Sequence, residues 1–314
     1  MPKFYLGEFM FYLPLIAAIQ ATHLTNDNVN FNISSERIYE TLKEKGVVEL
    51  SNPFFSKEDY NRLYESFDYF IELIKNDKNL LEKLTHIEKE FLSMENLSNQ
   101  YCSTPPSYRD YLEHTQKRHD KIYFQFIKEH YELFKSAYPE LLQSNPQIQE
   151  FFEQMAKIDE MAKKMFNVVV SGLQEKHPEV ENCLLGKNRE FTVVTKIVRY
   201  EKSDKWGTTP HFDKSGLTLI WDSDDEDHDS LLVCEKNLDP NVADLKKPKR
   251  NFANMDKVTS TLLIVGSCLS KVGININPTL HGVSSINKDR RHSVISFALV
   301  PNIDTSDLQT DFIK

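Results

Sequence analysis

The chain has 314 residues, of which 40% are hydrophobic and 27% are charged. This composition is typical of a globular protein with a substantial core, and it excludes a disordered, collagen-like or coiled-coil chain. The formal net charge is −9, which argues against binding nucleic acid through its phosphates, because that mode needs a basic surface.

Cysteine spacing and the N-terminal residues bear on the compartment. The four cysteines form no CxxC or CxxxC pair, which suits a reducing compartment and predicts neither a zinc ribbon nor a disulfide framework. Residues 9–21 are apolar, but Pro14 interrupts them and Lys3 alone supplies a basic start, so a signal peptide is disfavoured. No segment approaches the ~20 apolar residues of a membrane span. We therefore expect a cytoplasmic protein with no membrane partner, and processing of residues 1–21 stays open.

Helical patterns dominate the chain up to about residue 185. A short helix after Ser35 should end at Gly46, because a glycine often stops a helix, and residues 47–50 should follow as a strand. Residues 56–59 have the form of a capping box, and the helix they open carries an apolar stripe. Asn145-Pro146 starts a second long helix with an apolar and aromatic stripe. These stripes predict a core and no cofactor site.

Beyond residue 185 the pattern changes to short β-rich runs between turn signals. The expected strands are 191–200, 217–221, 231–234, 261–265, 279–286 and 293–300. Several short strands in succession favour a sandwich or a barrel. We therefore expect a mainly helical part, residues 1–185, packed on a β-rich part, residues 186–314, as one compact unit.

The residues that point to chemistry begin with His211 and Asp213. Alternate residues of a strand point to one face, so these two side chains could bind one ion together, with His281 on a later strand as a third ligand. Two histidines and one carboxylate form the facial triad of non-haem Fe(II) oxygenases, which leaves positions open on the metal. By itself, a His-x-Asp tripeptide is a weak signal.

A second signal follows His281. Residues 287–289 have a turn-like composition, and Arg291, Ser293, Ile295 and Phe297 then alternate onto one face of the next expected strand. An inward arginine needs an anion for its guanidinium group. A dicarboxylate cosubstrate that chelates the metal at one end would supply that anion at its other end.

Two neighbours of these residues are expected to face the other way. Arg199 alternates away from Tyr200, so we expect it in a structural salt bridge, and His292 alternates away from Arg291 and is not expected to bind a metal. The acidic run 222–229 and the basic run 246–250 are expected to be exposed loops.

Together, these motifs resemble the 2-oxoglutarate- and Fe(II)-dependent dioxygenases, in particular the isopenicillin N synthase-like branch. The resemblance covers about residues 190–302 and is carried by Arg199-Tyr200, His211-x-Asp213, Gly216 to Leu219, His281 to Val283, Arg291-x-Ser293 and Phe297. The sequence departs from the family where Val198 replaces a common asparagine and where Ser267, instead of aspartate, follows Gly266. Neither departure touches a ligand.

The resemblance implies an α+β fold whose core is a double-stranded β-helix, a jelly roll or cupin-like barrel, flanked by long N-terminal helices. It also implies roles for six residues: the Fe(II) ligands His211, Asp213 and His281, and the 2-oxoglutarate-binding residues Arg291, Ser293 and Tyr200.

The implied activity is the O₂-dependent hydroxylation or desaturation of a small organic substrate, with release of succinate and CO₂. Two alternatives stay open: an Fe(II) oxidase that needs no 2-oxoglutarate, as in the enzymes for which the branch is named, and a catalytically silent binding protein on the same fold. A nucleic-acid substrate is not expected. The sequence identifies neither the substrate nor the oligomeric state.

Overall fold

The computed structural model describes residues 35–51, 55–80, 82–84, 121–185, 190–223, 230–234, 260–300 and 303. Residues 1–21, the basic run 246–250 and most of the acidic run 222–229 lie outside these ranges. In the part that is described, no helix has both the length and the apolar character to cross a membrane.

The helices include the three that the sequence predicts. They are α2 (Ser35–Lys45), α3 (Lys57–Asn76), α6 (Lys128–Ala137), α7 (Pro139–Ser144), α8 (Pro146–Gln174), α9 (Val180–Leu184) and α10 (Cys268–Lys271). Ser56 and Asp59 close a capping box before α3, since each side chain accepts a hydrogen bond from the other residue's backbone N–H. Gly46 follows α2 at φ 73°, a conformation that glycine adopts at little cost.

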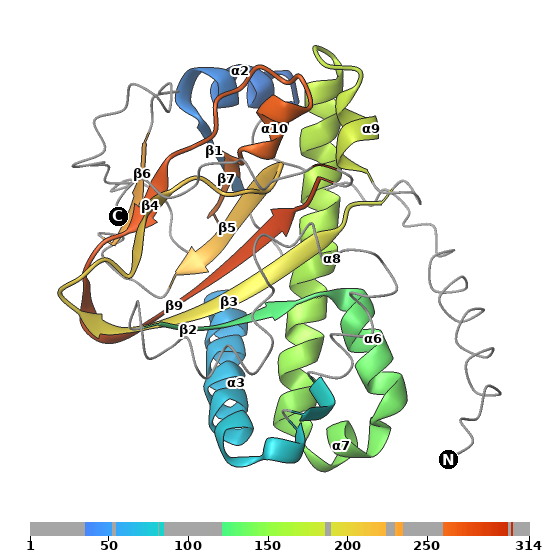
Figure 1. Ribbon diagram of the computed structural model, residues 1–314, viewed down its shortest axis with the longest axis vertical. Coiled ribbons are helices and arrows are strands. Elements are labelled where there is room, and N and C mark those ends of the chain that lie inside the picture. Colours follow the sequence, from blue (N-terminus) through green and yellow to red (C-terminus); the bar gives the residue numbers. More distant parts are fainter. Residues whose placement is uncertain are drawn as a thin grey trace, which may run out of the picture.

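The strands form two antiparallel sheets. The six-stranded sheet has the order β1 (Val47–Ser51), β7 (Ser260–Val265), β5 (Leu217–Ser223), β9 (Ile286–Ala298), β3 (Val193–Ser203) and β2 (Lys121–Phe126). The three-stranded sheet has the order β4 (Thr208–His211), β8 (His281–Val283) and β6 (Leu231–Val233). Both edge strands of the larger sheet, β1 and β2, come from the mainly helical part of the sequence (Figure 1).

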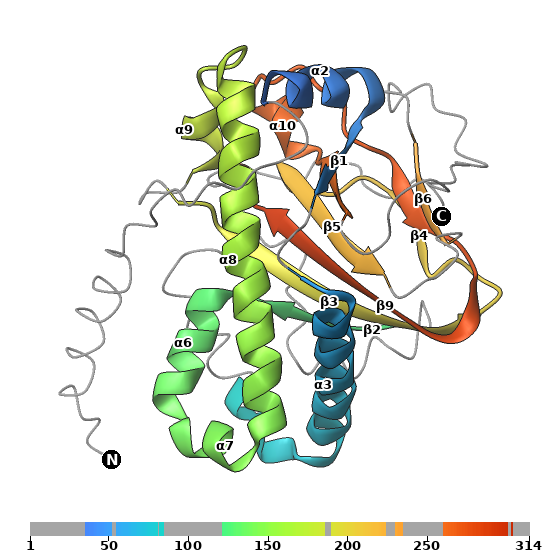
Figure 2. The same ribbon diagram turned by 180° about the vertical axis from the view of Figure 1, so that it is seen from behind.

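The larger sheet lies between the helices and the smaller sheet. On one face, Ile197 and Leu219 share a core with Phe151 of the long helix α8, which crosses behind the sheet in Figure 1 and in front of it in Figure 2. On the other face, Val233 of the smaller sheet packs with Ile264 of β7. We call this second face, which the smaller sheet covers, the inner face. The architecture of long helices against antiparallel sheets agrees with an α+β fold.

Several strands differ from the sequence-based expectation. β2 is not predicted at all, and the expected strand 279–286 is divided between β8 and the start of β9. Because β9 begins at Ile286, residues 287–289 continue a strand and do not form a turn. The pairing of β9 with β3 continues to Ser203, past a register shift that follows Glu201. Asp289 is exposed, which explains how this end of the strand can have a turn-like, polar composition.

Candidate metal centre

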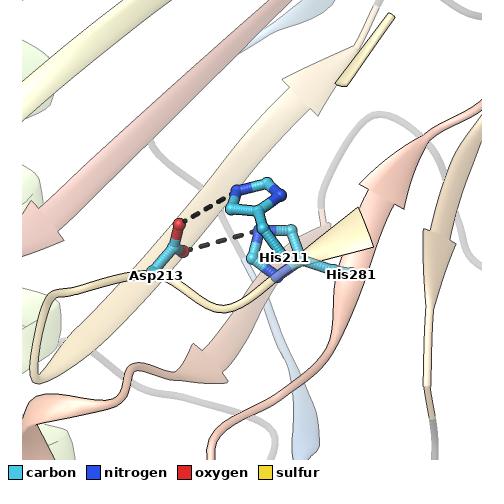
Figure 3. A group of neighbouring side chains, drawn as sticks. All are labelled: His211, Asp213 and His281. Carbon is cyan, nitrogen blue, oxygen red and sulfur yellow. Dashed lines mark ion pairs between the residues drawn. The ribbon is translucent and has the colours of Figure 1, made fainter. Parts of the chain in front are cut away.

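Two neighbouring strands of the smaller sheet bring three ligand residues together. His211 is the last residue of β4, His281 is the first residue of β8, and the two are register partners. Asp213 lies just after the end of β4, so it does not continue the strand as expected. The candidate ligand atoms of the three residues lie within 4.8 Å of one another, and Figure 3 shows both imidazole rings beside the carboxylate.

Backbone carbonyl groups fix which nitrogen of each histidine faces the centre. His211 Nδ1 donates to the carbonyl of Thr209 at 2.9 Å, and His281 Nδ1 donates to that of Thr279 at 3.1 Å. A carbonyl only accepts, so Nδ1 carries a proton, and in the neutral ring the lone pair is on Nε2. The Nε2 atoms lie 3.4 Å and 3.6 Å from the two carboxylate oxygens of Asp213.

These atoms fit a single metal ion. With metal–nitrogen bonds of about 2.1 Å, neighbouring ligands at right angles are separated by about 3 Å, so small side-chain rotations would bring all three onto one ion. Asp213 and His281 are each 7% exposed. Two imidazoles and one carboxylate are the donor set of non-haem Fe(II) sites.

The electrostatics of the centre keep Asp213 and His281 in the form that binds a metal. Burial by itself would raise the pKa of Asp213, but His281, His211 and the Thr218 hydroxyl outweigh it and hold this pKa well below its usual range. Burial lowers the pKa of the His281 imidazole, against the attraction of Asp213. The carboxylate is therefore charged and His281 neutral at pH 7, which metal binding requires.

A layer of polar contacts orients Asp213. The Thr218 hydroxyl donates to Asp213 Oδ2 at 2.7 Å and lies 2.8 Å from the Ser215 hydroxyl. The backbone N–H of Ser267 donates to the Asp213 carbonyl at 2.7 Å. Gly266 makes this approach possible, because a Cβ at this position would lie 2.1 Å from the carbonyl oxygen of Ser215. Sequence reasoning assigned no role to Thr218, whose hydroxyl becomes informative only once its distance to Asp213 is known.

The three residues expected to bind 2-oxoglutarate share the inner face. Arg291 pairs with Tyr200 across β9 and β3, and Ser293 is the next residue of β9 on the same face. Arg291 is 2% exposed, and its guanidinium carbon lies 5.2 Å from the centre of the Tyr200 ring. The Tyr200 hydroxyl lies 3.2 Å from that of Thr208 on β4, which links this group to the strand that ends in His211.

Arg199 and His292 face the helices, as the strand alternation predicts. Both contact Asp68 of α3, with an Arg199 Nη1–Oδ1 distance of 2.9 Å and a His292 Nε2–Oδ1 distance of 3.1 Å. Arg199 also pairs with Glu201 at 2.9 Å. The salt bridge expected of Arg199 is therefore confirmed.

The sequence analysis missed Lys196, which stands on the inner face of β3. Its Nζ atom lies 4.2 Å from the centre of the Tyr123 ring on β2. Burial lowers the pKa of this ammonium group to about 8, against the attraction of Asp213. The sequence contains a signal for this residue, because Lys196 alternates with Val194, Val198 and Tyr200 on a strand face that is otherwise apolar there.

No protein-family model matches the sequence, and neither does any curated protein. Solved structures match most of the chain. The dioxygenase for auxin oxidation from rice aligns with a TM-score of 0.53 and 14% identity, over 85% of this chain and 78% of that one. The Arabidopsis thaliana dioxygenase for auxin oxidation 1, in a binary complex with 2-oxoglutarate, gives 0.52 and 15%, over 88% and 95%.

A third match has the same architecture. A full-length Neurospora crassa protein, solved in complex with α-ketoglutarate and thymine, aligns with a TM-score of 0.52 and 12% identity, over 85% of this chain and 80% of that one. At such identities the likeness establishes the fold. The chain therefore has the fold of the 2-oxoglutarate-dependent dioxygenases, as its motifs predict.

Proposed function

We propose that the protein is an Fe(II)- and 2-oxoglutarate-dependent dioxygenase that hydroxylates or desaturates a small organic substrate and releases succinate and CO₂. The observation that carries this proposal is the centre of His211, Asp213 and His281, in which both histidines are held with Nε2 toward the carboxylate. In the same proposal, the strands that residues 186–314 contribute to the two facing sheets form a double-stranded β-helix, and residues 1–185 support it with the helices and the edge strands β1 and β2.

The chain's own residues would hold and orient the reactants. His211, Asp213 and His281 would bind Fe(II), which supplies the activation of O₂ when bound. Arg291 and Ser293 would bind the far carboxylate of 2-oxoglutarate, because a buried guanidinium group is stabilised by a bidentate anion. The ring of Tyr200 lies beside the Arg291 guanidinium group and would limit where that carboxylate can sit.

The test is an anaerobic titration with Fe(II) and then 2-oxoglutarate, followed through the visible charge-transfer band of the chelated cosubstrate. We expect the band in the wild-type protein. His211→Ala should abolish iron binding. Arg291→Gln should still bind iron but should bind 2-oxoglutarate about 10- to 100-fold more weakly, because it loses a charge-assisted contact.

Matched controls come from the same classes of residue. Arg290→Gln removes an arginine next to Arg291 that is 57% exposed and pairs with Asp68, and His177→Gln removes a histidine that contacts Tyr39. Both should leave the band unchanged. Iron binding with O₂ consumption but no succinate would favour the cosubstrate-free oxidase, and failure to bind iron would favour a silent binding protein.

A further inference from the structure

Lys196 occupies a position on the inner face that neither the iron nor the cosubstrate accounts for. Across the sheet, its register partners are Gln125 on β2 and Ile295 on β9, and paired residues of neighbouring strands point to the same face. Ile295 packs against a cluster that includes Val283 of the smaller sheet, which shows that this row faces the smaller sheet. Lys196 therefore points toward the layer that carries the ligands.

The register separates Lys196 from the cosubstrate-binding residues. Ser293 lies one same-face step along β9 from Ile295, and Arg291 lies two steps along. Each step is two residues, or about 6.6 Å. The charge of Asp213 nevertheless reaches Lys196 and raises the ammonium pKa against the effect of burial. By register, Lys196, Ile295 and Ile220 form one row across β3, β9 and β5, and Thr218, which bonds Asp213, lies one same-face step along β5 from Ile220. Lys196 is therefore closer to the Asp213 end of the inner face than to Arg291.

The charge of Lys196 is not neutralised by the described part of the chain. No carboxylate of the described residues lies within ion-pair distance of its Nζ atom, and its contact there is the face of Tyr123. The Lys196 residue is partly buried, and a ring face compensates only in part for the hydration that its ammonium group loses. Its neighbour Gln125 supplies no counter-charge, because Gln125 Oε1 is a buried acceptor that has no hydrogen-bond partner among the described residues.

Resting on the proposed function, we infer that the organic substrate is a carboxylic acid whose carboxylate binds Lys196 Nζ. A single ammonium group matches one negative charge, whereas a phosphate would bring nearly two. The reacting C–H bond would then be placed by this anchor, separately from the carboxylate of 2-oxoglutarate at Arg291.

The experiment uses calorimetric titration of the anaerobic protein loaded with Fe(II) and saturating 2-oxoglutarate, so that the site at Arg291 is occupied. The probes are benzoate, phenylacetate and hexanoate, each beside its primary amide. We expect at least one acid to bind and its amide to bind about 10-fold more weakly or not at all, because the amide loses a charge-assisted hydrogen bond.

Three variants assign the preference to Lys196. Lys196→Met should weaken acid binding about 10- to 100-fold and leave the 2-oxoglutarate band unchanged, and Lys196→Arg should restore most of the affinity. Lys202→Met is the matched control, since Lys202 lies on the same strand and its side chain is 65% exposed. If one of the acids is a substrate, Lys196→Met should raise its KM by a larger factor than it lowers kcat.

The outcomes separate this inference from the function on which it rests. If the wild-type protein forms no 2-oxoglutarate band, the proposed function and the substrate inference fall together. If the band forms, the substrate inference alone is overturned by any of three results: no acid binds, the amides bind as tightly as the acids, or Lys196→Met binds the acids as the wild type does.

Discussion

Thr218 shows how one hydroxyl can matter at the residue scale. Its bond to Asp213 Oδ2 orients the carboxylate, and such outer contacts tune metal affinity. Thr218→Val keeps the shape of the side chain and should weaken Fe(II) binding about 10-fold or more, measured by competition with a chelator. Thr195→Val removes a buried hydroxyl contact with Ser296 on the helix-facing side and should leave iron affinity unchanged. Equal affinity in both variants would argue against the orienting role.

Asp159 carries a buried charge that the site does not use. It is 0% exposed in α8, and Lys163 Nζ lies 3.4 Å from its carboxylate and 3.0 Å from that of Glu129. Burial, only partly opposed by Lys163, raises the pKa of Asp159 to about 7. The folded state therefore binds this proton more tightly than the unfolded state does, and the stability contribution falls as the pH rises from about 4 to about 7.

Asp159→Asn should remove that pH dependence. At about pH 4 the variant and the wild type should unfold at similar denaturant concentrations, whereas at pH 8 the variant should be more stable by on the order of 1 kcal/mol or more. Lys163 keeps Glu129 as its partner, so no buried cation is left alone. Glu160→Gln, at a partly exposed position of the same helix, is the control. A loss of stability at pH 8 would contradict the prediction.

At the scale of elements, Asp68 joins α3 to the two neighbouring strands β3 and β9. Its carboxylate contacts Arg199, Arg290 and His292, and the ring of His292 stacks on Tyr64 of α3 at 4.8 Å. Burial on its own would raise the pKa of Asp68, but His292 and Arg199 lower it to about 2. This contribution to stability is present above about pH 4 and is lost as the pH falls toward 2.

Asp68→Asn should destabilise the protein by about 2 kcal/mol at pH 7, the free energy that a pKa lowered by nearly two units represents. The difference from the wild type should shrink as urea unfolding is repeated from pH 4 toward pH 2. Glu72→Gln, on the same helix with a side chain 60% exposed, should change the stability by less than about 1 kcal/mol. A pH-independent difference would show that the contact acts through packing and not through charge.

At the scale of the whole molecule, bound iron should stabilise the fold. The ligands come from β4, the residues after it and β8, and the unfolded chain does not hold them together. Fe(II) at about 100 times its Kd should add about 2.7 kcal/mol, seen as a rise in Tm under anaerobic conditions that a chelator reverses. His211→Ala should abolish the rise, and a rise that survives this substitution would place the metal elsewhere.

The sequence predicted the elements whose signals are local. Capping at Ser56 and the glycine stop at Gly46 depend on neighbouring residues, and the alternation of Arg291 and Ser293 depends on the period of a strand. The candidate ligands could be recognised because their residue types are rare in combination. Local patterns therefore indicated the fold class and brought the three ligands to attention.

Other features depend on pairings that no local pattern encodes. β2 is a short run whose place at the sheet edge comes from its pairing with β3, and the polar start of β9 is a strand because β3 continues beside it. Thr218 and Lys196 acquire a role only through their placement near Asp213. Each of these depends on contacts between residues far apart in sequence.

The placement of β1 and β2 at the two edges of the larger sheet also bears on how such a protein can be inherited or dissected. A fragment that starts at residue 186 would lack both edge strands and would expose the apolar face that packs against α8, which favours aggregation. We therefore expect that the chain cannot be divided near residue 185, where the sequence changes from helical to β-rich, for gene fusion, truncation or domain exchange. The two parts would have to be acquired, and would have to diverge, as one heritable unit.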